Sequence, residues 1–200
     1  MTDQVREIAQ CLSHGGVVLL PTDTVLGLAV SPQHTAAIDR LYRLKHRPRD
    51  KNLPIMVADA DQIGTLGARI TPSAQALLSS PFVPGALTIV FGLDPARAPE
   101  WLARRDEIAL RIPNDAWLLA VLRETGPLLV TSANRSGAQT PGTADEAAAQ
   151  LNGTPDLIVA GTGHKATPST IVNCRVTPAR IERLGAVSEA EIASLLEGLL

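Results

Sequence analysis

Two threonines flank an aspartate where one apolar segment of this sequence gives way to the next. Thr22, Asp23 and Thr24 follow VVLL (17–20) and precede VLGLAV (25–30). Hydroxyl groups donate and accept hydrogen bonds, and a carboxylate binds an amine or a metal ion, so the group suits a small polar ligand. The other interpretation is a turn held by local side-chain hydrogen bonds. From this segment alone, both interpretations stay open.

A second segment, LKHRPRDKNLP (44–54), concentrates positive charge directly after a predicted helix. Its basic residues are Lys45, His46, Arg47, Arg49 and Lys51. Lysine offers a point charge and arginine a planar fork, a combination that suits phosphate oxygens. A run of charges is more often a solvated surface, and cations at a helix C-terminus also stabilise the helix through its dipole. Phosphate binding is therefore one of two interpretations.

Arg111 stands inside the apolar segment ALRIP (109–113). Burying an arginine costs free energy unless the guanidinium is paired. Its partner is either a carboxylate of the protein or the carboxylate of a bound ligand, and the sequence favours neither.

Two further segments place small polar residues beside apolar strands. VTSANRSG (130–137) offers hydroxyl, amide and backbone N–H groups to an anion or a ribose. Its density of polar groups favours a binding site over an ordinary loop. TPSTIV (167–172) presents Ser169 and Thr170, a weak signal by itself.

The composition is typical of a globular protein and gives little support for nucleic acid as a partner. Of the 200 residues, 45% are hydrophobic and 19% are charged, and the net charge of −2 gives no overall attraction to nucleic acid. Aromatic residues make up 2%, so few platforms exist for base stacking. The polar N-terminus and the absence of a long apolar run predict a cytoplasmic protein without a membrane span.

The pattern of elements predicts a mixed α/β protein. We expect helices over 3–13, after an N-cap at Ser31 followed by Pro32, after Thr71-Pro72, from an N-cap at Asn114 to about 123, from a Thr143/Glu146 capping box to about 151, and after a cap formed by Ser188 with Glu191. We expect strands near 17–20, 25–30, 54–58, 86–91, 108–112, 127–132, 157–160, 169–173 and 180–184. Interleaved strands and helices, with several strands continuously apolar, indicate a twisted open sheet of parallel and antiparallel strands flanked by helices. Polar segments at strand ends are where such sheets place ligands.

No motif for a covalent nucleophile, a Walker loop or a zinc protease is present, and two cysteines are too few for a four-cysteine zinc site. In this order the segments resemble the YrdC/Sua5 family of threonylcarbamoyl-AMP synthases. The matching pieces are PTDTVLGL, the Lys45-x-Arg47 pair, PGALTIVF, ALRIP, TSANRSG, PSTIV and RLGAVS. They extend over about residues 15–188, so we expect one YrdC-like domain over 1–200 with a concave basic cleft, as in the short members.

The resemblance implies a nucleotidyltransferase that joins L-threonine, bicarbonate and ATP into threonylcarbamoyl-AMP and pyrophosphate. A threonylcarbamoyl transferase complex would then use the product to modify position 37 of tRNA. Mg²⁺ would enter with ATP and need few protein ligands.

The resemblance also implies roles for individual residues. Lys45 and Arg47 would be catalytic and would hold the ATP phosphates. Threonine and bicarbonate would be bound by Thr22, Thr24, Arg111 and Ser169. The remaining ATP-binding residues would be Ser132, Asn134, Thr140 and Arg183.

Three positions depart from the family pattern. Leu26 stands where many members carry Tyr or Phe, and Met56 where some carry His; Asn173 replaces a frequent Asp at a position that we take to be peripheral. The first alternative function is a non-catalytic relative that binds tRNA or ribosomal RNA through a basic surface. The second is a carbamoyl-adenylate enzyme like the domain found in hydrogenase maturation, which normally sits in a much longer chain.

Overall fold

The computed structural model describes residues 2–162 and 167–199. These residues divide into two compact units, one made of residues 2–53 and 115–162 and the other of residues 54–114 and 167–199. We call them unit 1 and unit 2 and describe each by itself. The predicted single domain over 1–200 stays a prediction.

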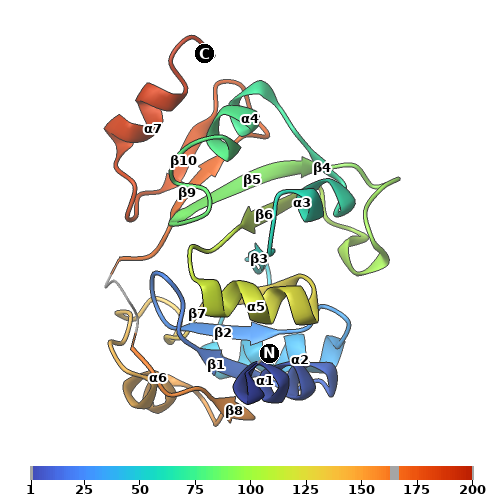
Figure 1. The fold of residues 1–200 in the computed structure, drawn as a ribbon, viewed down its shortest axis with the longest axis vertical. Coiled ribbons are helices and arrows are strands. Elements are labelled where there is room, and N and C mark those ends of the chain that lie inside the picture. Colours follow the sequence, from blue (N-terminus) through green and yellow to red (C-terminus); the bar gives the residue numbers. More distant parts are fainter. Residues whose placement is uncertain (1, 163–166, 200) are drawn as a thin grey trace. The chain divides into compact units, whose positions relative to one another are not determined.

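Unit 1 is a four-stranded sheet with helices on its faces (Figure 1). Its strands are β1 (Val18–Leu20), β2 (Gly27–Val30), β7 (Leu128–Ser132) and β8 (Leu157–Ile158), in the spatial order β7-β2-β1-β8. The β1–β2 and β2–β7 pairs are antiparallel, and β1–β8 is parallel.

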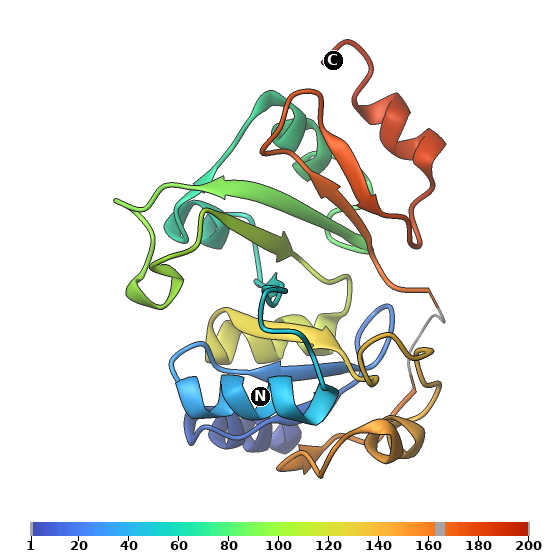
Figure 2. The ribbon, with the colours of Figure 1, turned by 180° about the vertical axis from the view of Figure 1, so that it is seen from behind.

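The helices of unit 1 are α1 (Asp3–Ser13), α2 (Thr35–Lys45), α5 (Ala116–Thr125) and α6 (Ala144–Gln150). Figures 1 and 2 show α1 and α5 side by side on one face of the sheet and α2 on the other. Covering both faces explains why β1 and β2 are fully buried, as their continuous apolar sequences predict.

The strands of unit 2 follow the order β10-β9-β5-β6-β3, with β4 also paired to β5. These strands are β3 (Ile55–Met56), β4 (Ala68–Arg69), β5 (Leu87–Leu93), β6 (Glu107–Arg111), β9 (Thr170–Asn173) and β10 (Arg180–Arg183). The β3–β6 and β5–β9 pairs are parallel, and the β5–β6 and β9–β10 pairs are antiparallel. The predicted class, a mixed α/β fold with parallel and antiparallel strands, is confirmed.

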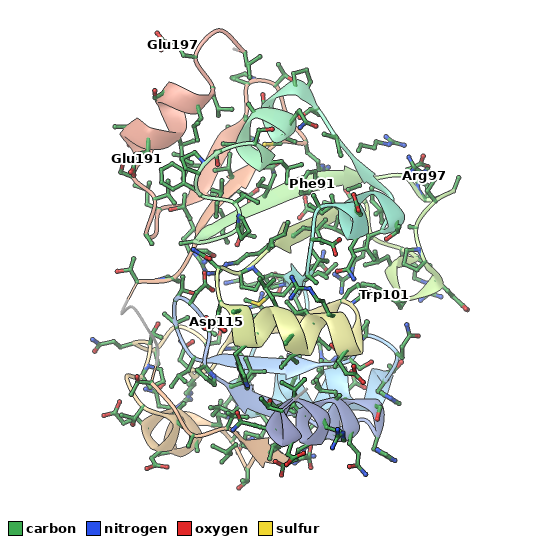
Figure 3. All side chains as sticks on the ribbon, viewed as in Figure 1. Phe91, Arg97, Trp101, Asp115, Glu191 and Glu197 are labelled. Atoms are coloured by element: carbon green, nitrogen blue, oxygen red, sulfur yellow. The ribbon has the colours of Figure 1, made fainter. Side chains whose placement is uncertain are left out.

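The helices of unit 2 are α3 (Asp61–Thr65), α4 (Pro72–Leu78), the short 3₁₀ helix η1 (Glu100–Leu102) and α7 (Glu189–Leu195). The Thr170 hydroxyl donates to Val187 O at 2.6 Å, which attaches the segment before α7 to one face of the sheet. That face carries the apolar core of the unit, including Phe91 on β5 (Figure 3). The opposite face carries the polar residues described below.

Helix ends follow their sequence signals at most positions. Thr71 caps α4, and Thr143 and Ser188 each form a capping box. Two predicted caps are wrong. The hydroxyl of Ser31 accepts from Gln33 N in a local turn, so α2 begins three residues later with His34 as its N-cap. Asp115, not Asn114, caps α5, because its carboxylate accepts from Leu118 N at 2.8 Å.

None of the described helices is long and apolar enough to cross a membrane.

Gly185 permits the closest backbone approach in unit 2. A Cβ at this position would lie 2.2 Å from Pro168 O and 2.5 Å from Ser169 C. Only glycine therefore lets the segment after β10 pass beside Ser169.

We expect Gly185→Ala to destabilise the protein by about 1–3 kcal/mol, because backbone atoms must move to admit the methyl group. Gly64→Ala in α3 is the matched control, since nothing lies within 4 Å of its added Cβ and alanine favours the helix. Urea unfolding of both variants checks this. A Gly185→Ala variant as stable as Gly64→Ala would contradict the backbone contact.

Candidate functional site

The loop between β1 and β2 is held by the hydroxyl of Thr22. Thr22 Oγ1 donates to Val25 O at 2.6 Å and accepts from Thr24 N at 3.1 Å. The two threonine hydroxyls lie 3.1 Å apart, and both side chains are buried. Since the single proton of Thr22 is used within its own loop, the turn interpretation describes Thr22 well. A ligand role for Thr22 and Thr24 stays a prediction.

Gly27 lets this loop close on the sheet. A Cβ at Gly27 would lie 3.0 Å from Val130 Cγ1 and 3.3 Å from Thr22 Cγ2. Ala133 N donates to Leu26 O at 2.7 Å, which joins the loop to the segment that follows β7. Leu26 itself is fully buried. Two of the predicted segments, PTDTVLGL and TSANRSG, are thus brought into direct contact.

Lys45, the last residue of α2, reaches the same place from inside the unit. Its ammonium donates to Ser132 O and, at 2.7 Å, to Asn134 O. Only 2% of the residue is exposed. Burial lowers the pKa of Lys45 to about 7, and the nearby Arg47 cation acts in the same direction. Among the described residues the hydrogen-bond partners of the Lys45 ammonium are two neutral carbonyls, so the buried cation favours an anion at this point.

Asn134 adds a second sign of a ligand. Its Nδ2 donates to Arg135 O and Ala138 O, at 2.9 and 2.8 Å, which fixes the amide plane. Its Oδ1 is buried and has no hydrogen-bond partner among the described residues. A buried acceptor without a donor costs free energy that a bound hydroxyl or amine would recover. Thr140 lies later in this segment, half-buried, and is not among the groups that hold Lys45.

The rest of the basic segment has a different role from Lys45. Arg47 donates from Nε to Lys51 O at 3.1 Å and from Nη2 to Asn52 O at 2.8 Å, which stiffens the loop after α2. Arg49 stacks over the Tyr42 ring at 4.8 Å and pairs with Asp39 at 2.5 Å. The solvated-surface interpretation therefore fits Arg49. Arg47 lies on the wall of a surface hollow that is also lined by Tyr42, Arg43, His46, Arg49 and Asn152.

In unit 2 the polar residues gather on one face of the sheet. Ile89 pairs with Leu110, and continuing this antiparallel register places Thr88 opposite Arg111. Thr88 pairs with Ile171 on the other side, so Ser169, two residues earlier, shares its face. Arg183 pairs with Ile171 as well. Thr88, Arg111, Ser169 and Arg183 therefore lie on the same face.

Hydrogen bonds hold these side chains in place. Arg111 Nε donates to Gly85 O at 2.8 Å, which gives this 6% exposed arginine one of its partners in the strand. Arg183 Nη2 donates to Ser169 O at 2.7 Å and to Ser169 Oγ at 3.2 Å. Ser169 Oγ also lies 2.8 Å from Thr88 Oγ1. Met56 pairs with Arg111 across β3 and β6, so this departure from the family pattern lies beside the arginine.

The predicted residues therefore form two sets, one in each unit. Lys45, Ser132 and Asn134 meet in unit 1, and Arg111, Ser169 and Arg183 share a face in unit 2. In the described part of the chain, no three His, Cys, Asp or Glu side chains gather closely enough to hold a metal ion.

Comparison with known proteins identifies the fold and the lineage. The model of the Sua5/YciO/YrdC family, described as "Telomere recombination", matches residues 10–185. The chain belongs to this family.

Curated family members similar to this chain are named threonylcarbamoyl-AMP synthase. One from Bacillus subtilis (strain 168) is 33% identical over 197 residues, which cover 96% of this chain and 56% of the relative. One from Shigella boydii serotype 4 is 32% identical over 173 residues, covering 84% of this chain and 90% of the relative. The chain thus spans little more than half of the first relative and most of the second.

Solved structures of the family agree with the fold. Sua5 from P. abyssi, complexed with L-threonine, superposes with a TM-score of 0.85 at 28% identity, covering 96% of this chain and 57% of that one. E. coli YciO superposes with a TM-score of 0.82 at 22% identity, covering 94% and 92%, and shows the likeness of fold alone. The predicted membership in the YrdC/Sua5 family is confirmed.

One residue of the family segment PGALTIVF was missed by sequence reasoning. Thr88 is the only hydroxyl in the run LTIVF, and the structure places it against Ser169. A lone polar residue within a continuously buried strand is a usable signal, because such a group must find a partner.

The lowered pKa of Lys45 predicts how stability depends on pH. In the unfolded chain the lysine binds its proton up to its ordinary pKa of 10.5, whereas the folded protein releases it near pH 7. The cost of burying the ammonium is therefore complete below pH 7 and is relieved as the pH rises toward 10.5.

Relative to Lys45→Met, we expect the wild-type protein to gain about 2 kcal/mol of unfolding free energy between pH 7 and pH 9. Urea unfolding at several pH values measures the difference. Lys51→Met removes an exposed lysine and is the control, with a difference from wild type that does not change with pH. The same flat difference for Lys45→Met would show that the buried ammonium keeps its ordinary pKa.

Proposed function

We propose that this protein is a threonylcarbamoyl-AMP synthase, which condenses L-threonine, bicarbonate and ATP into threonylcarbamoyl-AMP and pyrophosphate. The observation that carries the proposal is the buried Lys45 ammonium, which donates to the main-chain oxygen of Asn134, together with the side-chain Oδ1 of Asn134, which has no hydrogen-bond partner among the described residues. The chain is also similar to synthases over most of its length. The whole activity, its substrates and its partners are part of this proposal.

The residues of unit 1 supply a nucleotide-binding set. Lys45 and Arg47 would act on the phosphates. The buried Lys45 cation would interact with an anion more strongly than a cation in water does, and Arg47 would act from the loop after α2. Asn134 Oδ1 accepts, so it would pair with a hydroxyl or amine of the nucleotide. Ser132 and Thr140 would complete the set of ATP-binding residues. Thr22 and Thr24 would bind the bicarbonate and the threonine.

The residues of unit 2 supply an amino-acid-binding set. Arg111 would bind the threonine carboxylate, which gives the in-strand arginine a function as well as a structural partner. Ser169 would contact the same substrate, and Arg183 would act toward the ATP phosphates. The threonine-bound Sua5 structure from P. abyssi, which is similar to this chain, supports an amino-acid substrate.

The proposed reaction needs charge neutralisation and alignment rather than an enzyme nucleophile. The threonine amine takes up carbon from bicarbonate and releases water, which gives a carbamate. A carbamate oxygen then attacks the α-phosphorus of ATP, and the bond to the β-phosphate oxygen breaks as pyrophosphate leaves. Fixed cations lower the barrier by stabilising charge that moves onto the leaving group.

Mg²⁺ would arrive with ATP, held by phosphate oxygens and water. The donor set in unit 1 consists of a cation, amide and hydroxyl groups, which suits phosphates more than a bare metal ion. We further propose a cytoplasmic location and delivery of the product to a threonylcarbamoyl transferase complex that modifies tRNA.

The second candidate is a non-catalytic RNA-binding protein. The cluster of Arg43, His46, Arg47 and Arg49 around one hollow favours it, because such a surface attracts backbone phosphates. The other alternative, a carbamoyl-adenylate enzyme like the domain found in hydrogenase maturation, has weaker support. A phosphate- and nucleotide-bound HypF structure is only 19% identical to this chain, so the similarity is one of fold alone.

Pyrophosphate release by the purified protein tests the proposal. ATP is supplied with and without L-threonine and bicarbonate, and the adenylate is sought by mass spectrometry. We expect release that requires both co-substrates. Folded protein that releases no pyrophosphate under any combination, yet binds tRNA with steep salt dependence, would establish the RNA-binding alternative.

Lys45→Met should lower kcat by roughly 10²-fold or more, because a preorganised cation near the phosphates is removed. The variant keeps an unbranched side chain of similar volume without the ammonium group, and circular dichroism checks its fold. Lys51→Met is the control and should keep wild-type activity. Full activity in Lys45→Met would remove the phosphate role from this residue.

Arg111→Ala should raise the KM for threonine far more than the KM for ATP, with a loss of about 2–4 kcal/mol for a charge-assisted pair. Steady-state kinetics with each substrate varied in turn measures both values. An equal rise in the two KM values would mean that the arginine is structural.

A further inference from the structure

Thr88 stands in the central strand of unit 2 with its hydroxyl turned toward the polar face. The residue is 2% exposed, and Thr88 Oγ1 lies 2.8 Å from Ser169 Oγ. Among the described residues this is the one hydrogen bond of the Thr88 side chain. Thr88 Oγ1 is either the donor or the acceptor of this hydrogen bond, and the choice determines which of the two hydroxyls has an unused proton.

Ser169 Oγ is constrained from a second side. Arg183 Nη2 lies 3.2 Å away, and a guanidinium has only donors. One lone pair of Ser169 Oγ is therefore used by Arg183. The hydroxyl keeps one proton and one further lone pair for Thr88 and for anything that binds.

Two arrangements of protons are open to the pair. If Ser169 donates to Thr88, the unused proton lies on Thr88, deep in the sheet. If Thr88 donates to Ser169, the unused proton lies on Ser169, which is 6% exposed. A buried donor without an acceptor costs free energy, and the cost is greater where neither water nor a ligand reaches it. The second arrangement is therefore favoured.

The geometry points to Thr88 as a positioning residue that donates to Ser169, so that the Ser169 hydroxyl presents its proton to an oxygen atom of the amino-acid substrate. Arg111 lies opposite Thr88 on the same face, so the acceptor that suits both donors is the substrate carboxylate. This inference rests on the proposed function, because it concerns how the threonine of that reaction is held.

Thr88→Val removes the hydroxyl and keeps the shape of the side chain. A methyl group does not approach an oxygen closer than about 3.3 Å, so Ser169 must turn away from its position. Thr88→Ser restores the hydroxyl and is the conservative variant that should rescue binding. Thr170→Val is the contrasting variant, because the Thr170 hydroxyl bonds to Gly185 N, Val187 N and Val187 O within the fold.

Isothermal titration calorimetry with L-threonine and with ATP measures the effect. We expect Thr88→Val to weaken threonine binding roughly five- to tenfold, as for one lost hydrogen bond, and to leave the Kd for ATP unchanged. Thr88→Ser should bind threonine like the wild type. Thr170→Val should lower the melting temperature of the protein and leave the ratio of the Kd for threonine to the Kd for ATP unchanged.

A double-mutant cycle separates positioning from packing. If Thr88 acts through Ser169, Thr88→Val should have no further effect on threonine affinity in a Ser169→Ala background. Three results would each overturn the inference, provided that the wild-type protein binds threonine. The first is that the losses of threonine affinity add in the double mutant. The others are that Thr88→Val binds threonine like the wild type, or that Thr88→Ser binds threonine as weakly as Thr88→Val. Wild-type protein that binds ATP but no threonine would instead overturn the amino-acid substrate, and this inference with it.

Discussion

The Lys45 ammonium, held inside unit 1 by the carbonyl oxygens of Ser132 and Asn134, is the interaction on which the candidate site depends. It joins the end of α2 to the end of β7, and Ser136 N returns a hydrogen bond to Lys45 O at 2.8 Å. Two segments far apart in the sequence are thereby fixed to each other. The same contact explains why the basic segment begins with a lysine, since a compact ammonium fits where a guanidinium fork would not.

Unit 2 contains a buried cation, Arg111, and an exposed one, Arg183. Arg111 Nε donates to Gly85 O, and Arg183 donates to Ser169 O and Ser169 Oγ. The hydroxyls of Thr88 and Ser169 lie on the same polar face, and the apolar core occupies the other. The alternation of side chains along β5 is enough to separate the polar face from the apolar core, because neighbouring residues of a strand point to opposite sides of the sheet.

Much of this arrangement follows from sequence pattern. Apolar runs predicted the strands, capping boxes predicted the starts of α6 and α7, and a charge in the strand ALRIP predicted that Arg111 needs a partner. Local competition explains the errors. Ser31 makes a turn of its own before α2, and Asp115 outcompetes Asn114 because its carboxylate reaches the free N–H of Leu118. The elements α3, β4 and η1 are short, and they carry no periodic signal of their own.

The missed features depend on contacts between distant residues. No local pattern distinguishes Lys45, which enters the core, from Arg49, which pairs with Asp39 at the surface, although both belong to one basic run. Likewise the sequence signals that Thr88 needs a partner, but Ser169 is identified as that partner only when β5 and β9 are placed in register. The sequence identifies the segments that form the candidate site. Strand pairing and tertiary contacts determine which side chains of those segments could face a ligand.

The pKa of about 7 for Lys45 also links charge to ligand binding. Without an anion, burial and Arg47 leave the ammonium only partly protonated near neutral pH. A phosphate beside it favours the charged form and raises that pKa, so the bound state holds the proton more tightly than the free protein. Binding of an anion therefore carries a proton into the protein, and the cost of the buried cation is relieved when its partner is present. In the proposed nucleotidyl transfer, Lys45 would therefore carry its full charge in the complex with the nucleotide, where it would stabilise charge on the phosphates.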